Sequence, residues 1–174
     1  TVRDLAQLCP FEETLEELNE RLPVTLYFHN DEPDPKTRDT TTDLNYMATY
    51  DAYVDLKPQY KKEYSSGLNG EEALFAKEDI EDFFTEFVDQ GVADLELFSE
   101  LLLKELEKGI RIRMTVKGFA SPLAKTDYNV NLTKRRISSM VNYLRAYQDG
   151  VYQKYLDGTA ENGGILEIVQ VPFG

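Results

Sequence analysis

The sequence contains few of the residues that most often carry catalytic, redox or metal chemistry. Its 174 residues include one cysteine, Cys9, and one histidine, His29. A lone cysteine excludes an internal disulfide and leaves the redox compartment open. The sequence has no His/Cys metal spacing, no glycine-rich phosphate loop and no nucleophile elbow. It therefore predicts a protein that is not an enzyme and needs no metal or cofactor, with His29 as a strand-end imidazole satisfied by the next loop.

Positive charge and long apolar runs are also scarce. There are 19 Lys and Arg residues against 32 Asp and Glu residues, so the formal net charge is −13. Such a surface should repel nucleic acid and anionic membranes. No apolar stretch is long enough to span a membrane. We therefore expect no nucleic-acid partner and no membrane span in this chain.

One targeting motif to consider in this sequence is a lipoprotein signal. The segment LAQLC at 5–9 lacks the upstream apolar run of such a signal, and Leu8 is too large for the position before the cysteine. Cys9 is therefore expected to be a structural thiol. The first residue is Thr1 and not Met, so we expect any export signal or membrane anchor to lie in a segment outside this sequence.

The sequence does contain clear strand and helix patterns. Strands are expected at 24–29, 110–117 and 165–171. Helices are expected at 78–108 and 129–147. Gly91 should weaken the first helical region and divide it into two pieces, and Gly109 should end it. The patterns predict an α/β (α+β) sandwich in which the three strands share one sheet and both helical regions pack on one face.

The strand at 110–117 separates apolar from polar side chains. Its polar face carries Arg111, Arg113, Thr115 and Lys117. Two interpretations are open for this face: it holds an anion, or it pairs with the many carboxylates of the chain. The excess of acidic residues favours the second interpretation.

Residues 30–76 follow the first expected strand and contain a polar loop and a tyrosine-rich segment. The loop at 30–43 carries clustered carboxylates that would suit calcium, but its spacing does not match an EF-hand and favours a solvated loop. Five tyrosines then recur at helical spacing around Pro58, which predicts a kink or two short helices. They are Tyr46, Tyr50, Tyr53, Tyr60 and Tyr64. Packing of these rings is favoured over an aromatic platform for sugars.

The most specific signal lies in residues 110–144. A strand is followed by a short loop, a Tyr-Asn pair, two adjacent arginines and an apolar helical stripe. This order and spacing resemble the OmpA-like peptidoglycan-associated domain of OmpA C-terminal regions, Pal lipoproteins and flagellar stator proteins. The positions that match are Gly118, Phe119, Ala120, Ser121, Tyr128, Asn129, Leu132, Thr133, Arg136, Ile137, Val141, Tyr143 and Leu144.

The resemblance implies a fold, a compartment and a function. The fold would be a β-α-β-α-β domain over 23–174, after a helical lead-in at 1–22 and with a helical insertion at about 30–76. Long versions of this kind resemble the OmpA-like lipoproteins of the Bacteroidetes group. The function implied is non-catalytic anchoring to peptidoglycan in a Gram-negative cell envelope, from the periplasm and in association with the outer membrane. The ligand would be the diaminopimelate of the stem peptide.

The resemblance also implies a binding site. In the family, the arginine at the position of Arg136 binds a carboxylate of diaminopimelate, and a helix start and a bidentate guanidinium both suit that ligand. The implied binding residues are Arg136, Ser121, Asn129, Leu132 and Thr133. Thr133 is a plausible N-cap, and Arg135 is expected on the surface. The alternative, in which both arginines pair with nearby acids such as Asp127, stays open.

Two departures from the family bear on function. Ser121 stands where the family has the aspartate that binds the ammonium of diaminopimelate, and the closing Asn-Arg-Arg strand of the family is absent. The hypotheses are, in order, peptidoglycan binding, the same fold as a periplasmic protein-interaction module that has lost wall binding, and a carboxylate-based glycan hydrolase. The expected partners are the peptidoglycan stem peptide and other envelope proteins.

Overall fold

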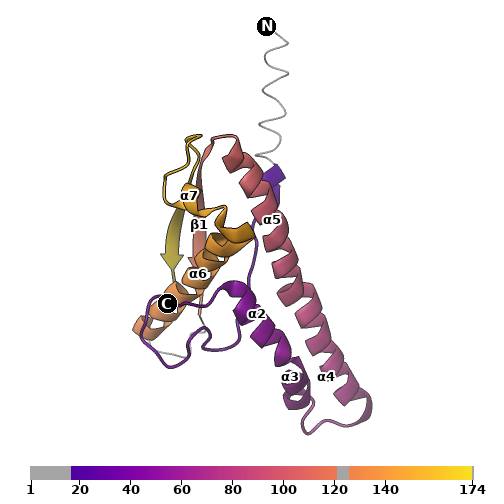
Figure 1. Cartoon of the computed structure of the whole chain (residues 1–174). Coiled ribbons are helices and arrows are strands. Elements are labelled where there is room, and N and C mark those ends of the chain that lie inside the picture. Colours follow the sequence, from indigo (N-terminus) through magenta and orange to yellow (C-terminus); the bar gives the residue numbers. More distant parts are fainter. Residues whose placement is uncertain (1–16, 121–125, 174) are drawn as a thin grey trace.

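The computed structural model describes residues 17–120 and 126–173, and a two-stranded parallel sheet lies at one side of it (Figure 1). Strand β1 (Arg111–Gly118) pairs with strand β2 (Ile165–Pro172). The register runs from Arg111 opposite Ile165 to Gly118 opposite Pro172. Two of the three predicted strands therefore exist and share a sheet.

A helical connection joins the two parallel strands, as parallel pairing requires. It consists of α6 (Thr126–Ala146), the 3-10 segment η2 (Tyr147–Gly150) and α7 (Gln153–Leu156). The apolar stripe of α6, which includes Ile137, Met140 and Leu144, is buried in the main core. The predicted helix at 129–147 is thus confirmed, with an earlier start.

The segment expected to form the third strand, 24–29, is extended but does not join the sheet. No backbone hydrogen bond connects it to β1 or β2 among the described residues. Instead, the Tyr46 hydroxyl donates to the Tyr27 carbonyl at 3.0 Å and accepts from the Tyr27 N–H at 3.3 Å. The predicted three-stranded sheet is therefore wrong for this segment, because a side chain replaces the neighbouring strand. The chain is a mixed α/β structure that is mostly helical.

One long helix replaces the two helical pieces expected at 78–108. It consists of α4 (Gly70–Phe83), the π-helical segment η1 (Phe84–Asp89) and α5 (Gln90–Glu107). Gly91 does not interrupt this helix; a Cβ atom there would lie 2.3 Å from the Thr25 carbonyl oxygen. Glycine at this position therefore allows the extended segment to approach the helix. Gly109, at φ +82°, ends the helix as predicted.

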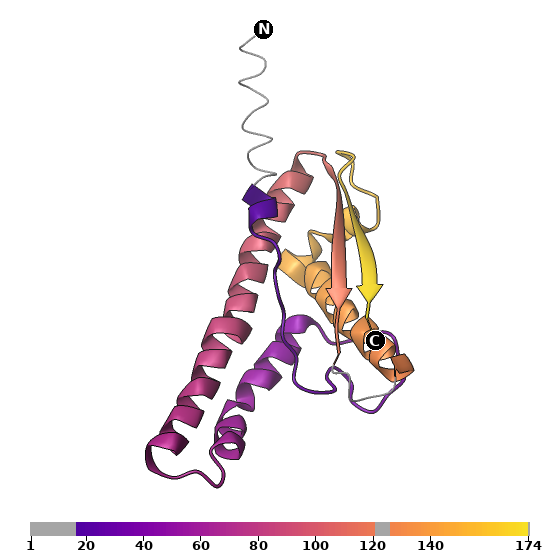
Figure 2. The same ribbon diagram turned by 180° about the vertical axis from the view of Figure 1, so that it is seen from behind.

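Two short helices and the first half of the long helix form an arm that lies away from the sheet (Figures 1 and 2). The short helices are α2 (Tyr46–Asp55) and α3 (Lys57–Tyr64), and Pro58 stands at the start of the second, as predicted. A small apolar cluster holds the arm together: Tyr53, Ile80, Phe84 and Val88. Tyr46 and Tyr53 are buried, whereas Tyr64 is 61% exposed, so most of the tyrosine segment packs as expected.

The N-terminal predictions fall largely on residues that the structure does not describe. Cys9 and residues 1–16 of the lead-in lie outside the described residues. Residues 17–20 are helical, and Leu18 belongs to the main core. Within the described part of the chain, no helix combines the length and the apolar character needed to cross a membrane.

Candidate functional site

Four of the five implied binding residues lie on α6, but not at its start. The helix begins at Thr126, so Asn129, Leu132 and Thr133 lie inside it and are 3%, 5% and 0% exposed. Thr133 is therefore not an N-cap, and its hydroxyl donates to the Val130 carbonyl at 2.8 Å. The side chains of these three residues are buried, and their part in ligand binding stays a prediction.

Arg135 was expected on the surface, and this prediction is wrong because the side chain is fully buried. Its guanidinium donates to three backbone carbonyls of the insertion loop: Pro33 at 3.0 Å, Thr37 at 3.2 Å and Asp39 at 2.8 Å. It also lies over the Tyr128 ring, 5.6 Å from the centroid. A cation–π contact of this kind partly replaces lost hydration. The Nη2 atom is buried with no hydrogen-bond partner.

Arg136 is held in the same way one position later. Its Nε donates to the Glu32 carbonyl at 2.9 Å, its Nη1 to the Phe119 carbonyl at 2.9 Å and its Nη2 to the His29 carbonyl at 3.4 Å. Burial lowers the pKa of Arg136, and the adjacent charge of Arg135 lowers it further, whereas the Asp31 carboxylate acts in the opposite direction. The guanidinium that the resemblance assigns to a ligand is here bonded to backbone carbonyls of the chain itself.

Side-chain contacts complete the attachment of the loop to α6. The Tyr128 hydroxyl donates to the Asp31 carboxylate and accepts from the Lys36 N–H at 3.1 Å. The other oxygen of Asp31 accepts from the same N–H at 3.2 Å. Among the described residues, neither arginine forms an ion pair with Asp127. Backbone carbonyls, three for each arginine, take the place of the acids that the alternative interpretation required.

His29 joins this loop to the arm. Its Nδ1 atom lies 2.5 Å from the Tyr60 hydroxyl, and its ring lies 5.9 Å from that of Tyr53. Burial raises the pKa of Tyr53 to about 12 and also raises the pKa of Tyr60. His29 therefore has a partner from α3, and not from the following loop as predicted.

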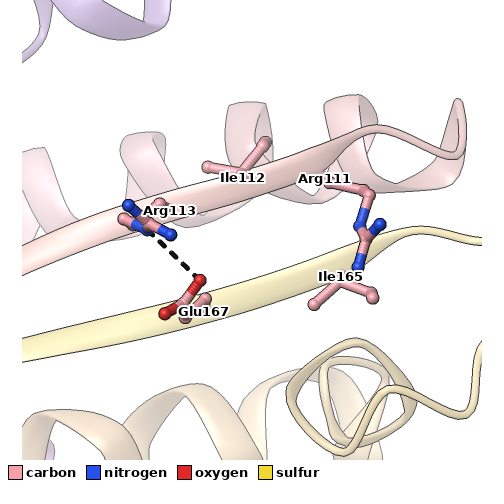
Figure 3. Close-up of a pocket in the computed structure, with 5 residues that line it drawn as sticks. All are labelled: Arg111, Ile112, Arg113, Ile165 and Glu167. Atoms are coloured by element: carbon pink, nitrogen blue, oxygen red, sulfur yellow. Dashed lines mark hydrogen bonds and ion pairs between the residues drawn. The ribbon is translucent and has the colours of Figure 1, made fainter.

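Arg136 lines neither of two surface depressions that the described residues form. One of about 310 Å³ lies on the sheet and is lined by Arg111, Ile112, Arg113, Ile165 and Glu167 (Figure 3). The other, of about 520 Å³, lies between α5 and the end of α6 and is lined by Ala93, Glu96, Leu97, Glu100, Tyr143 and Tyr147. Ser121 lies outside the described residues, so its relation to Arg136 stays a prediction.

The structure also brings together residues that the sequence does not connect. The rings of Phe119 and Phe173 stack with centroids 5.0 Å apart and planes 5° apart, and both are exposed at the end of the sheet. Only the β1–β2 register places these two phenylalanines side by side. Each follows its strand directly, which was the one signal available in the sequence.

Neither a metal site nor a known relative accounts for the arrangement of Arg135 and Arg136. Within the described residues, no group of three or more His, Cys, Asp and Glu side chains is placed to hold a metal ion. Comparison with models of protein families, with curated proteins and with solved structures finds no match.

Proposed function

We propose that the chain is a non-catalytic protein-interaction module of a cell envelope, with a variant of the OmpA-like fold that has lost wall binding. The observation that supports this proposal is the state of the two arginines. Both are occupied by backbone carbonyls of residues 29–39, at the position where the family binds its ligand. The cations then serve to attach the insertion to α6, and the module presents other surfaces to its partners.

The relation to the OmpA-like fold is part of this proposal. The strand–helix–strand unit formed by β1, α6 and β2 has the order that the resemblance implies. The extended segment 24–29 occupies the place in the chain of the family's first strand, although it is held by Tyr46. In this interpretation the insertion has displaced the first strand from the sheet.

Peptidoglycan binding is the second candidate, and one feature of Arg136 favours it. A guanidinium has five N–H groups, and three of those of Arg136 are bonded to carbonyls. The Nη1 atom reaches the carbonyl of Phe119, two residues before Ser121. Two N–H groups thus stay available for a stem-peptide carboxylate near that loop.

Co-sedimentation with purified sacculi that contain diaminopimelate separates the two candidates. We expect the native chain to stay in the supernatant, as a protein without a wall site would. Saturable sedimentation that free diaminopimelate reverses would contradict the interaction module and establish wall binding. Ser121→Asp provides the matched variant, because it restores the carboxylate that the family has at this position.

The affinity of the Ser121→Asp variant for stem peptide provides a quantitative test. If wall binding exists in the native chain, Ser121→Asp should tighten it about tenfold, since a charged hydrogen bond exceeds a neutral one by roughly 1–2 kcal/mol. If the arginines are fully used by the loop, the same change should produce no binding. A titration with stem peptide at fixed salt measures either result.

A further inference from the structure

The outer face of the β1–β2 sheet is not covered by any part of the chain that the structure describes. Figure 2 shows both strands in front of the helices, with no described element over them. The inner face of β1 packs against the core through Ile112, Met114 and Val116. Parallel sheets in folded proteins usually have both faces covered. Among the described residues, only one face of this sheet is therefore covered.

One half of the outer face is basic. Arg111, Arg113, Thr115 and Lys117 all point outward from β1 and are exposed. Only Arg113 is paired, with Glu167 across the sheet at 3.2 Å, and both side chains of that pair are exposed. Within the described residues, Arg111 and Lys117 have no ion pair. The sequence predicts that the cations of this face pair with carboxylates of the chain. Of the three cations, Arg113 does so.

The other half of the outer face is apolar except for Glu167. Side chains that are opposite each other in a parallel pair lie on the same face, so Ile165, Val169 and Val171 accompany the basic row. The row continues into the stacked rings of Phe119 and Phe173, which are 62% and 43% exposed. The three aliphatic side chains are half-buried and the two rings are exposed. A partly exposed apolar row beside a charged row is typical of an interaction surface.

We propose that the outer face of the β1–β2 sheet binds an acidic, amphipathic segment of a partner protein. This inference rests on the proposed interaction module and names its binding surface. Charge decides the class of partner: three cations and one carboxylate gather on one face of a chain whose net charge is −13. A complementary segment carries acids on one side, toward β1, and apolar residues on the other, toward β2.

The apolar row distinguishes a protein segment from a polyanion. Nucleic acid or polyphosphate would neutralise Arg111 and Lys117 but leave the two exposed phenylalanines and the half-buried Val169 and Val171 in contact with water. An amphipathic segment covers both rows at once and removes apolar area from water. The depression of about 310 Å³ between Arg111 and Ile165 offers a place for one anchoring side chain (Figure 3).

The test uses the full chain and a synthetic amphipathic helical peptide with leucines on one face and glutamates beside them. Amide shifts in the NMR spectrum report where the peptide binds. We expect shifts confined to β1, β2 and the residues around Phe119 and Phe173. A peptide of the same composition in scrambled order should bind about tenfold more weakly, because it cannot present both rows together.

Two variants with the same change in charge provide the control. Arg111→Glu/Lys117→Glu should weaken peptide binding about tenfold, whereas Lys62→Glu/Lys77→Glu, at exposed lysines of the arm, should leave it within about twofold. Val169→Thr/Val171→Thr keeps the strand propensity but removes apolar contact, so it should also weaken binding.

Four results would overturn the inference. They are absent shifts on the strands, equal losses in both charge variants, equal binding of the scrambled peptide, and polyphosphate binding as tight as that of the amphipathic peptide. Concentration-dependent dimers lost in Arg111→Glu/Lys117→Glu would instead identify a second copy as the occupant and overturn the assignment to a partner protein. The sacculus assay involves none of these residues, so its result and this one are independent.

Discussion

At the scale of single residues, the most informative side chain is Arg135. A fully buried guanidinium normally has a carboxylate partner, and here it has three carbonyls and an aromatic ring. The position is predictable from the sequence only as one of two adjacent arginines on an amphipathic helix. Its partners lie 96 to 102 residues away and are backbone atoms, which carry no sequence signature.

Replacing this side chain should be severe. Arg135→Ala leaves three carbonyls without their donor and opens a cavity under the loop, so we expect the free energy of unfolding to fall by about 3 kcal/mol or more. Arg135→Lys should recover only part of this loss, because an ammonium group cannot reproduce the spread of the guanidinium fork. Urea denaturation followed by circular dichroism measures both.

Arg145→Ala supplies the control on the same helix. Arg145 is exposed and pairs with Asp157 at 3.2 Å, so its removal should lower the free energy of unfolding by less than about 1 kcal/mol. Equal losses for Arg135→Ala and Arg145→Ala would show that the buried arginine does not hold the loop.

At the scale of elements, the sequence predicts the helices and strands whose signals come from residues close together in the chain. The alternation in β1, the stripe on α6 and the stop at Gly109 are local patterns, and all three appear in the structure. The segment 24–29 has an equally clear alternation but forms no ladder. Whether an extended segment joins a sheet depends on what lies beside it, and here that neighbour is Tyr46 from a helix of the insertion.

Gly91 tests this account of the extended segment. In a helix interior, Gly→Ala normally stabilises by about 0.5–1 kcal/mol. At position 91 we expect the opposite sign, a loss of about 1–3 kcal/mol, because the new methyl group would meet the Thr25 carbonyl oxygen at 2.3 Å. Thermal unfolding of Gly91→Ala measures the change.

The effect of helix propensity on stability at this end of α5 is measured separately. Ala93→Gly changes an exposed position two residues later on α5 and should destabilise by about 1 kcal/mol through helix propensity alone. A gain in stability for Gly91→Ala would mean that the segment 24–29 moves away from the helix without loss.

At the scale of the whole molecule, tyrosines of α2 connect the short helices of the arm to the extended segment 24–29 and to the long helix. Tyr50 donates to Asp89 at 2.6 Å, and this bond raises the pKa of Tyr50 to about 12. Burial raises the pKa of Tyr53 to the same value. In the unfolded chain a tyrosine ionises at about pH 10. The folded chain therefore keeps protons that the unfolded chain loses.

This difference predicts sensitivity to alkali. The stabilisation is fully present below about pH 10 and is lost as the pH rises from there towards 12, because ionisation then favours the unfolded chain. Urea midpoints measured across this range should fall steeply in the native chain and less steeply in Tyr53→Phe. Tyr64→Phe, at an exposed ring, is the control. An identical slope in Tyr53→Phe and the native chain would contradict this origin of the sensitivity.

The attachment of the insertion loop has a consequence for how its sequence can vary. The guanidinium groups of α6 recognise the path of the backbone from 29 to 39, and not the identity of its side chains. Apart from His29 and Asp31, whose side chains contact Tyr60 and Tyr128, the composition of this stretch should therefore be tolerant, while its length should be strict. Arg38→Ala, at an exposed position between two of the accepting carbonyls, should change stability by less than about 0.5 kcal/mol. Deleting Arg38 should shift those carbonyls out of register and approach the loss expected for Arg135→Ala. In this loop, the number of residues therefore matters more for stability than the identity of most of the side chains.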